Sequence, residues 1–214
     1  MYADRSAGGQ ALVPPLEKYK GSKEVVVLGL PRGGVPVAYE VARALELPLD
    51  VLIVRKLGVP GNPELAMGAI ASGDARYLNE DVIRLAGVGA REIEQVEETE
   101  HCELLRRERF YRGGRPPLDV KGRTVILVDD GIATGASMRV AARAMRAAGV
   151  LKVVVAVPVA PAEAQNRFEG IADEFVCAQA PRSFRAVGQF YDRFDQTTDD
   201  EVRGLLDRAQ AEAA

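Results

Sequence analysis

Residues 125–137 read VILVDDGIATGAS, and this stretch decides the fold. The apolar residues 125–128 are typical of a strand that is buried on both faces. Two carboxylates, Asp129 and Asp130, stand where that strand ends, and a glycine-containing loop then leads into a helix that begins at Ser137. Because ligands of open α/β sheets bind at the carboxyl ends of the strands, we expect a ligand site here.

The loop combines groups that attract a phosphate with two groups that repel it. Backbone N–H groups at a helix N-terminus attract phosphate, Thr134 and Ser137 add hydroxyl donors, and Gly135 allows close approach. A ribose between the phosphate and the acids fits, because its two vicinal hydroxyls can donate to Asp129 and Asp130. The Asp-Asp-Gly sequence alone also fits a turn, and the TGAS sequence alone also fits a helix cap. Because the two stand together at a strand-to-helix junction, we favour the ligand interpretation.

Strands and helices alternate along the rest of the chain. Apolar runs predict strands at 24–30, 50–54, 123–128 and 151–157, with shorter ones at 67–71 and 172–177. Helices are expected at 35–45, 90–111, 137–148, 161–168 and 199–213, the last capped by Asp199, whereas the Gly/Pro-bearing start through Gly21 reads as loose. This order predicts an α/β fold with a doubly wound, mainly parallel sheet. We divide it into a core of residues 1–179, with a long insertion at about 58–117, and a C-terminal hood or tail at 180–214.

Composition excludes several other classes. The 28 basic and 31 acidic residues leave a net charge of −3, which argues against nucleic acid as a partner. No apolar run approaches the ~20 residues that span a bilayer, so we expect no membrane contact. Cys102 and Cys177 lack CxxC spacing, which argues against zinc and disulfides and favours the cytoplasm. The single histidine, His101, lies in a charged run and is expected to be solvated rather than catalytic.

Three motifs together resemble the type I phosphoribosyltransferases. VILVDDGIATGAS is similar at all 13 positions to their motif for 5-phosphoribosyl-1-pyrophosphate (PRPP). Residues 30–34 (LPRGG) resemble the pyrophosphate loop of the family, and residues 54–61 (VRKLGVPG) resemble the end of the second strand in adenine-type members. The resemblance covers roughly residues 20–160 and keeps the motif order of the family.

This resemblance implies transfer of a 5-phosphoribosyl group from PRPP to a nitrogenous base, or the reverse, through an oxocarbenium-like transition state. It implies catalytic roles for Asp129, Asp130, Arg32 and Lys56. The implied 5′-phosphate ligands are Gly131, Ile132, Ala133, Thr134, Gly135, Ala136 and Ser137, and the implied pyrophosphate ligands are Pro31, Arg32, Gly33, Gly34, Arg55 and Lys56. Mg²⁺ would be chelated by substrate oxygens, with no direct protein ligand and with Asp129 and Asp130 reaching it only through water. The peptide bond entering Arg32 is expected to be strained or cis, and a homodimer is expected at the level of the family.

The acceptor base stays open. Some purine-specific members carry an acid where this chain has Ala133, so a 6-oxopurine acceptor is disfavoured. Four aromatic residues near the C-terminus could cover the base or simply form core: Phe184, Phe190, Tyr191 and Phe194.

Two further alternatives concern the arginines and the activity itself. Five arginines cluster at the end of the predicted 90–111 helix, Arg106, Arg107, Arg109, Arg112 and Arg115. We favour a solvated helix face for them over a lid that delivers an arginine to pyrophosphate. The alternative to an enzyme is a regulatory module that senses PRPP or a nucleotide without turnover. A dinucleotide-binding enzyme is disfavoured, since no GxGxxG follows the first strand.

Overall fold

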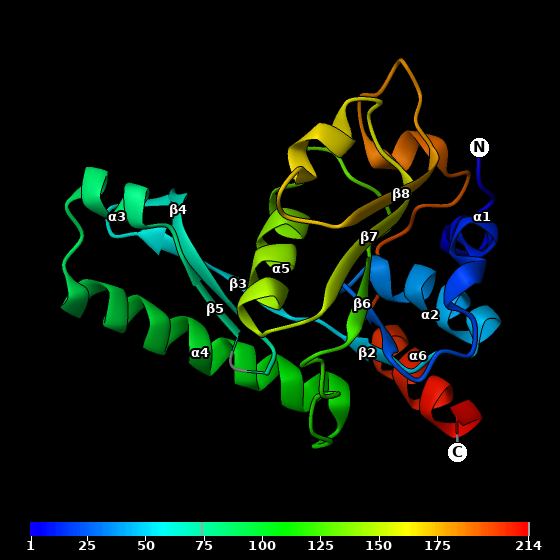
Figure 1. Ribbon diagram of the computed structural model, residues 1–214, viewed down its shortest axis with the longest axis horizontal. Coiled ribbons are helices and arrows are strands. Elements are labelled where there is room, and N and C mark those ends of the chain that lie inside the picture. The colour runs from blue at the N-terminus through cyan, green and yellow to red at the C-terminus, as the bar shows by residue number, and fades with distance from the viewer. Residues whose placement is uncertain (74, 214) are drawn as a thin grey trace.

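A five-stranded parallel sheet forms the centre of the computed structural model, which describes residues 1–73 and 75–213 (Figure 1). Its strands run in the order β2-β1-β6-β7-β8. Their bounds are Val25–Gly29 (β1), Leu49–Val51 (β2), Thr124–Val128 (β6), Lys152–Val159 (β7) and Glu174–Gln179 (β8). Because all five are parallel, their carboxyl ends lie along one edge of the sheet, where the loops that follow β1 and β6 are neighbours.

Helices cover both faces of this sheet, as the continuous apolar strands require. Along β6, Ile126 and Val128 pack in a cluster with α1 (Arg5–Leu16) and α2 (Gly34–Leu45). The alternate residues Val125 and Leu127 pack in another cluster with α5 (Ala136–Ala147) and the short 3₁₀ helix η2 (Ala164–Phe168). Helix α6 (Asp199–Ala213) lies against α2 and β2. The predicted doubly wound α/β sheet is therefore confirmed.

An arm projects from the sheet and consists of a second, antiparallel sheet with two helices (Figure 1). Its strands are β3 (Val54–Val59), β4 (Asn62–Ala71) and β5 (Ala75–Leu78), followed by α3 (Glu80–Ala86) and α4 (Ala90–Arg112). Leu57, Met67, Ile93 and Leu104 join them in one apolar cluster. The strand expected at 50–54 is thus divided between two sheets, and the strand expected at 67–71 is the end of a longer one.

The start of the chain is not loose, as expected from its glycines and prolines, but forms α1. Asp4 caps this helix by accepting a hydrogen bond from the Ala7 amide at 3.1 Å. Leu12 and Leu16 are fully buried against the sheet, and this burial outweighs the cost of two prolines in the last turn. Among residues 1–73 and 75–213, no helix has the length and apolar character needed to cross a membrane.

Several other expected elements are confirmed with small changes at their ends. The predicted short helix at 161–168 is η2, the strand at 172–177 is β8, and α6 has the predicted bounds. The helix α6 is capped by Thr198, whose hydroxyl accepts a hydrogen bond from the Glu201 amide at 3.1 Å, and not by Asp199. Two more 3₁₀ turns, η1 (Glu17–Tyr19) and η3 (Val187–Phe190), follow α1 and precede α6.

Candidate functional site

The loops that follow β1 and β6 touch each other at the carboxyl edge of the sheet. A Cβ atom on Gly33 would lie 2.1 Å from Oδ2 of Asp130, and one on Gly34 would lie 2.6 Å from the carbonyl oxygen of Val128. Only glycine allows this approach. The predicted pyrophosphate loop and the acid pair therefore form one continuous site, and the Pro31–Arg32 peptide bond within it is cis, as expected.

The acid pair is partly buried, and burial and the neighbouring charge of Arg5 have opposite effects on the pKa values of its two carboxyl groups. Burial and, after it, the neighbouring charge of Asp130 raise the pKa of Asp129 well above its ordinary value. Burial also raises the pKa of Asp130, against the opposing effect of Arg5, whose Nε donates to Oδ2 of Asp130 at 2.9 Å. Two carboxylates with a single guanidinium partner can accept further hydrogen bonds from ligand hydroxyls. Arg5 was not found from the sequence, because it lies in the segment that we expected to be loose.

The loop after β6 offers unpaired amides. In the described part of the chain, the amide groups of Ala133, Thr134 and Gly135 donate to no protein acceptor. Gly135 has a φ of 77°, a left-handed conformation that favours glycine, and it places the loop at the start of α5. Free amides at a helix N-terminus form an anion site. Ile132 differs from the rest of the loop, because its side chain is buried and its amide donates to the Val159 carbonyl at 2.9 Å.

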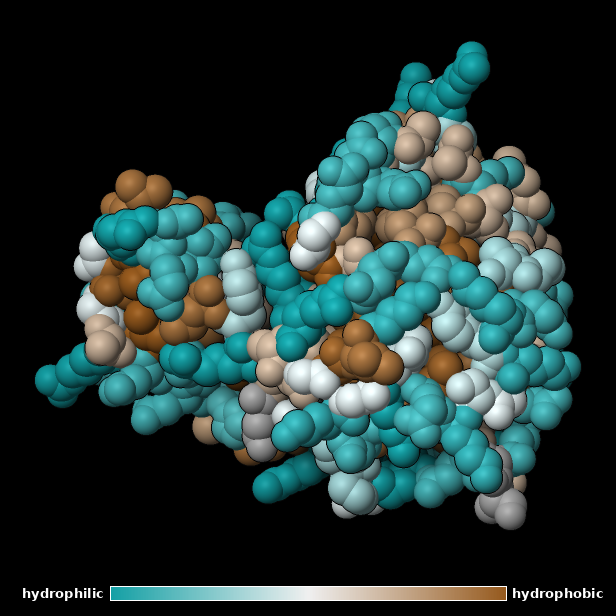
Figure 2. All heavy atoms as spheres, viewed as in Figure 1, coloured by the Kyte–Doolittle hydropathy of each residue, from teal (hydrophilic) through white to brown (hydrophobic). Residues whose placement is uncertain are grey.

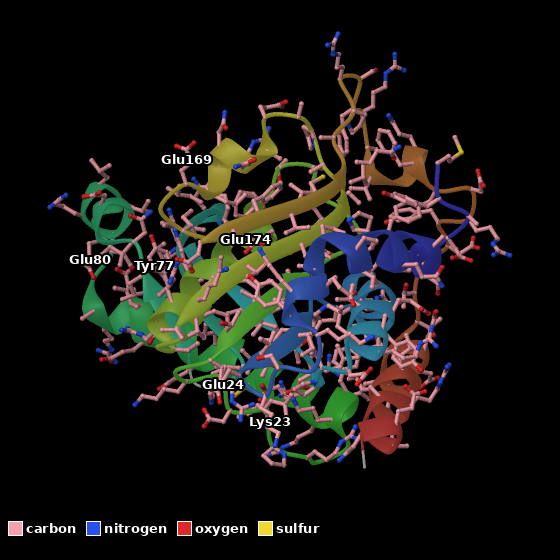
Figure 3. The ribbon with its side chains drawn as sticks, turned by 45° about the vertical axis from the view of Figure 1, so that its right-hand side comes forward. Lys23, Glu24, Tyr77, Glu80, Glu169 and Glu174 are labelled. Atoms are coloured by element: carbon pink, nitrogen blue, oxygen red, sulfur yellow. The ribbon has the colours of Figure 1, made fainter. Side chains whose placement is uncertain are left out.

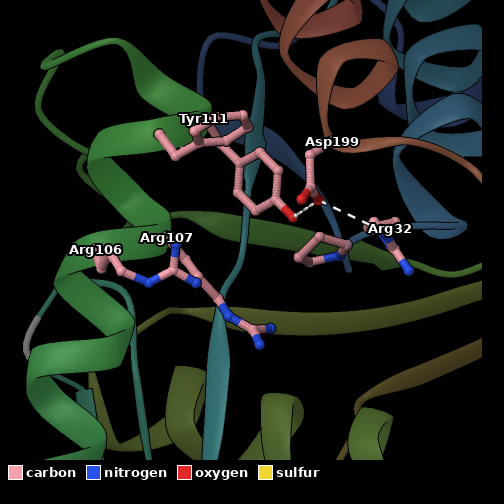
Figure 4. Close-up of a pocket in the computed structure, with 7 residues that line it drawn as sticks. Arg32, Arg106, Arg107, Tyr111 and Asp199 are labelled. Atoms are coloured by element: carbon pink, nitrogen blue, oxygen red, sulfur yellow. Dashed lines mark hydrogen bonds and ion pairs between the residues drawn. The ribbon is translucent and has the colours of Figure 1, made fainter.

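Beside Arg32 the structure forms a basic pocket of about 330 Å³ (Figure 4). Its lining consists of Pro31, Arg32, Arg106, Arg107, Phe110, Tyr111 and Asp199. The Tyr111 hydroxyl donates to Oδ1 of Asp199 at 2.6 Å, and Nη1 of Arg32 lies 3.9 Å from the same oxygen. Burial and this carboxylate raise the pKa of Tyr111 to about 12, so the phenol keeps its proton. Asp199 is the one carboxylate among the described lining residues, and Glu103 of α4 pairs with Arg106 and Arg107, each at 2.7 Å. Three guanidiniums against these two carboxylates leave a positive charge that favours an anion in this pocket.

Helix α4 is held in place next to this pocket. Arg112, at its end, is buried and donates through Nε to both carboxylate oxygens of Asp50, at 2.9 and 3.0 Å. The same guanidinium donates to the Val51 carbonyl at 2.8 Å. This buried pair fixes the last turn of α4 to β2. Arg106 and Arg107 therefore face Pro31 and Arg32 from an anchored helix, although the Arg/Glu pattern favoured a purely solvated face.

Two of the residues implied for pyrophosphate lie elsewhere. Arg55 donates to Glu100 of α4 at 2.6 Å, and the exposed Lys56 amino group lies 3.5 Å from Glu64. Neither belongs to the lining of the pocket beside Arg32. The reason is local: β3 leads from the end of β2 into the antiparallel arm, and acidic residues of the arm hold both side chains.

The C-terminal aromatic residues divide into two groups. Tyr191 is buried, and its hydroxyl donates to the Asp130 carbonyl at 2.6 Å, while Phe194 stacks on its ring with 5.0 Å between centroids. These two residues anchor the C-terminal segment by packing as core, which was one of the two alternatives for the aromatic residues. Phe184 and Phe190 are half-buried and stack on each other at 5.4 Å, so they stay available as a surface for a base.

The fold and these loops define the class. A parallel α/β sheet with an acid pair and an anion loop after β6 has the architecture of the type I phosphoribosyltransferases. Residues 15–192 match the family model described as "Phosphoribosyl transferase domain", and the chain belongs to this family.

Relatives agree with this assignment. The chain is 51% identical over all 214 residues to two Mycobacterium tuberculosis proteins, named "Putative phosphoribosyl transferase MT0597" and "Putative phosphoribosyl transferase Rv0571c". It spans about half of their length, 48%. The crystal structure of TT1426 from Thermus thermophilus is similar with a TM-score of 0.85 and 44% identity, over 96% of this chain and 97% of that one. AQ2163 from Aquifex aeolicus, with a TM-score of 0.50 and 15% identity over 86% of this chain and 78% of that one, shares the fold.

Proposed function

We propose that this chain binds PRPP and transfers its 5-phosphoribosyl group to a nitrogenous base, or catalyses the reverse, with pyrophosphate as the leaving group. The observation that carries this is the contact between Gly33 and Asp130, which makes the acid pair continuous with an anion site on either side. PRPP has the matching order of groups: a phosphate on C5, a diol on the ribose and a pyrophosphate on C1.

The loop after β6 supplies the ribose and 5′-phosphate contacts in this proposal. Asp129 and Asp130 accept hydrogen bonds from the two ribose hydroxyls. The amides of residues 133–135, together with the hydroxyls of Thr134 and Ser137, hold the phosphate at the start of α5. Gly131 brings the loop against the C-terminal segment, because a Cβ there would lie 2.6 Å from Cγ1 of Val187. The base would then lie under that segment, near Phe184 and Phe190.

Pyrophosphate lies in the pocket of Arg32, Arg106 and Arg107 in this proposal. Pre-positioned cations next to a leaving group stabilise the charge that develops in the transition state. Arg106 and Arg107 take the part that the family resemblance implied for Arg55 and Lys56, because they line the same pocket as Arg32. Asp199 would release Arg32 to the pyrophosphate, since their 3.9 Å separation is longer than a hydrogen bond.

Mg²⁺ fits this site as an ion held mainly by the substrate. In the described residues no cluster of three or more His, Cys, Asp or Glu side chains can hold a metal ion. The carboxylates of Asp129 and Asp130 suit a hard cation through bridging water. When bound, the ion would neutralise part of the pyrophosphate charge.

A regulatory module that binds PRPP without turnover is the alternative, and one observation favours it: Arg5 already neutralises Asp130 at 2.9 Å. Pyrophosphate release from PRPP and Mg²⁺, measured over a panel of purines and pyrimidines, separates the two. We expect base-dependent release with one acceptor, and its loss in Arg106→Gln/Arg107→Gln. Tight PRPP binding without release on any base would assign the chain to the regulatory class. A cytoplasmic location, inferred from the cysteine pattern, and a homodimer, expected from the family, stay proposals.

A further inference from the structure

A second basic cluster lies along α5, outside the pocket of Arg32. Arg139, Arg143 and Arg146 follow each other at spacings of four and three residues, which places them on one face of the helix. They line a hollow of about 810 Å³ between α5, η2 and the arm, which we call the α5 groove. Its other lining residues are Tyr77, Ala147, Asn166, Arg167, Glu169, Gly170 and Ile171. Figure 2 shows the molecule hollowed between the arm and the sheet, and Figure 3 labels Tyr77 on the arm and Glu169 beside η2.

Two of the four arginines of the groove have carboxylate partners. Arg146 pairs with Asp173 at 2.6 Å, and Arg167 pairs with Glu163 at 3.3 Å. Both partners lie in the η2 region that forms one wall. Acidic partners therefore offset only these two of the four guanidiniums, and Glu169 is the one carboxylate among the described lining residues.

The other two arginines carry the charge that is left over. Arg143 donates through Nη1 to the Tyr77 hydroxyl at 2.9 Å and lies over the Tyr77 ring, 4.9 Å from its centroid. Nε of Arg139 is buried and has no hydrogen-bond partner among the described residues. No ion pair to a described carboxylate is found for either residue. Two guanidinium charges without a carboxylate partner line the groove, so the groove is suited to an anion.

We propose that the α5 groove binds a phosphorylated small molecule, at a site separate from the one for PRPP. Guanidinium forks match phosphate oxygens in geometry, and two of them one turn apart can share one phosphate group. The Asn166 amide adds a neutral donor at the rim. A small ligand fits better than a nucleic acid, because the groove is walled by the arm and η2 and the chain carries a net charge of −3.

Arg167 connects the groove to the loop after β6. Its Nη1 donates to the carbonyls of Ala133 and Thr134, at 2.8 and 3.1 Å. A phosphate in the groove would compete with these carbonyls for the guanidinium and so change the conformation of the loop. Phosphate in the groove would thereby change the affinity for PRPP, and PRPP would change the affinity of the groove for phosphate by the same factor. This coupling rests on the function proposed above, whereas binding in the groove does not.

Titration calorimetry with inorganic pyrophosphate tests the proposal on the full chain. We expect two sites per chain in the wild type. Arg139→Gln/Arg143→Gln should lose one of them, with at least tenfold weaker binding, and keep the other within twofold. Arg106→Gln/Arg107→Gln should show the opposite pattern. The matched control, Arg84→Gln/Arg91→Gln, removes two exposed arginines outside the groove and should keep both sites.

A second variant guards against misfolding of the double mutant. Asn166→Asp preserves side-chain size at an exposed position and places a negative charge on the rim, so it should also weaken only the groove site. One pyrophosphate per chain that disappears in Arg106→Gln/Arg107→Gln would overturn the proposal. So would unchanged binding in Arg139→Gln/Arg143→Gln, or a short single-stranded RNA that binds the groove where pyrophosphate does not. If PRPP fails to bind but the groove site persists, the proposed function fails and this proposal stands.

Discussion

Replacing Gly33 by alanine tests the contact on which the site depends. The backbone there has φ −62° and ψ −29°, which alanine adopts without strain, so any effect comes from the new methyl group alone. That methyl carbon would lie 2.1 Å from Oδ2 and 2.8 Å from Cγ of Asp130. The Oδ2 atom must then move by more than 1 Å to reach the ~3.5 Å of an ordinary contact.

This movement should be visible in both stability and binding. Overpacking of this kind costs about 1–3 kcal/mol, and for a chain of this size each 1 kcal/mol lowers the melting temperature by about 2–4 °C. Gly33→Ala should therefore melt roughly 2–12 °C lower in differential scanning calorimetry. It should also bind PRPP at least tenfold more weakly, since one diol acceptor is displaced.

Gly204→Ala is the matched control. A Cβ on Gly204, within α6, meets nothing within 4 Å, so alanine should stabilise that helix by about 0.5–1 kcal/mol. It should leave PRPP affinity unchanged. A Gly33→Ala protein that melts with the wild type and binds PRPP equally would refute the proposed arrangement of the two loops.

The remaining predictions concern charge and specificity. Asp50→Ala leaves the buried Arg112 guanidinium with Glu108 as its remaining carboxylate partner and should cost about 1.5–3 kcal/mol in urea unfolding. A loss below about 1 kcal/mol would show that Asp50 does not anchor α4. Because burial raises the pKa of Asp129, PRPP affinity should fall on acidification at a higher pH than an ordinary aspartate titrates. For the same reason ionisation of Asp129 opposes folding as pH rises through its folded-state pKa. Asp129→Asn should therefore raise the melting temperature at neutral pH, and a lower melting temperature would contradict this reasoning. Since Ala133 provides no acid beside the base, kcat/KM for hypoxanthine and guanine should be below that for adenine or a pyrimidine. Efficient turnover of hypoxanthine would show that the residue at position 133 does not determine the choice of base.

The sheet and the loop after β6 were predictable because their signals are local. A strand buried on both faces needs a continuous apolar run, and residues 125–128 provide one. The loop motif is contiguous, so residues 129–137 could be assigned to one site without knowledge of the fold. The arm could not be predicted in the same way. The pairing of β3 with β4 depends on contacts between residues of two strands, and the hydrophobic pattern of one strand does not reveal its partner.

The residues that were missed are those whose role depends on distant contacts. Gly8 and Gly9 read as loop signals, yet in α1 they allow close packing: a Cβ on Gly9 would lie 2.6 Å from the Val37 carbonyl oxygen, and one on Gly8 would lie 2.9 Å from the Tyr191 hydroxyl. Arg107 lies among glutamates on a helix that reads as solvated, and only the position of α4 brings it to Arg32. The division at residue 180 and the extent of the insertion stay predictions.

The most direct test of the central claim is calorimetric titration of Mg²⁺–PRPP into the wild type and into Asp129→Ala/Asp130→Ala. Hydrogen bonds to charged acceptors contribute roughly 1.5–3 kcal/mol each, so the loss of two should weaken binding about a hundredfold or more. The double mutant should keep its fold by circular dichroism, because burial raises the pKa of both carboxyl groups and so disfavours their charged form in the wild-type fold. One PRPP per wild-type chain and this loss in the mutant are the predicted result. Equal affinity in the two proteins would contradict the assignment of the acid pair to the ribose.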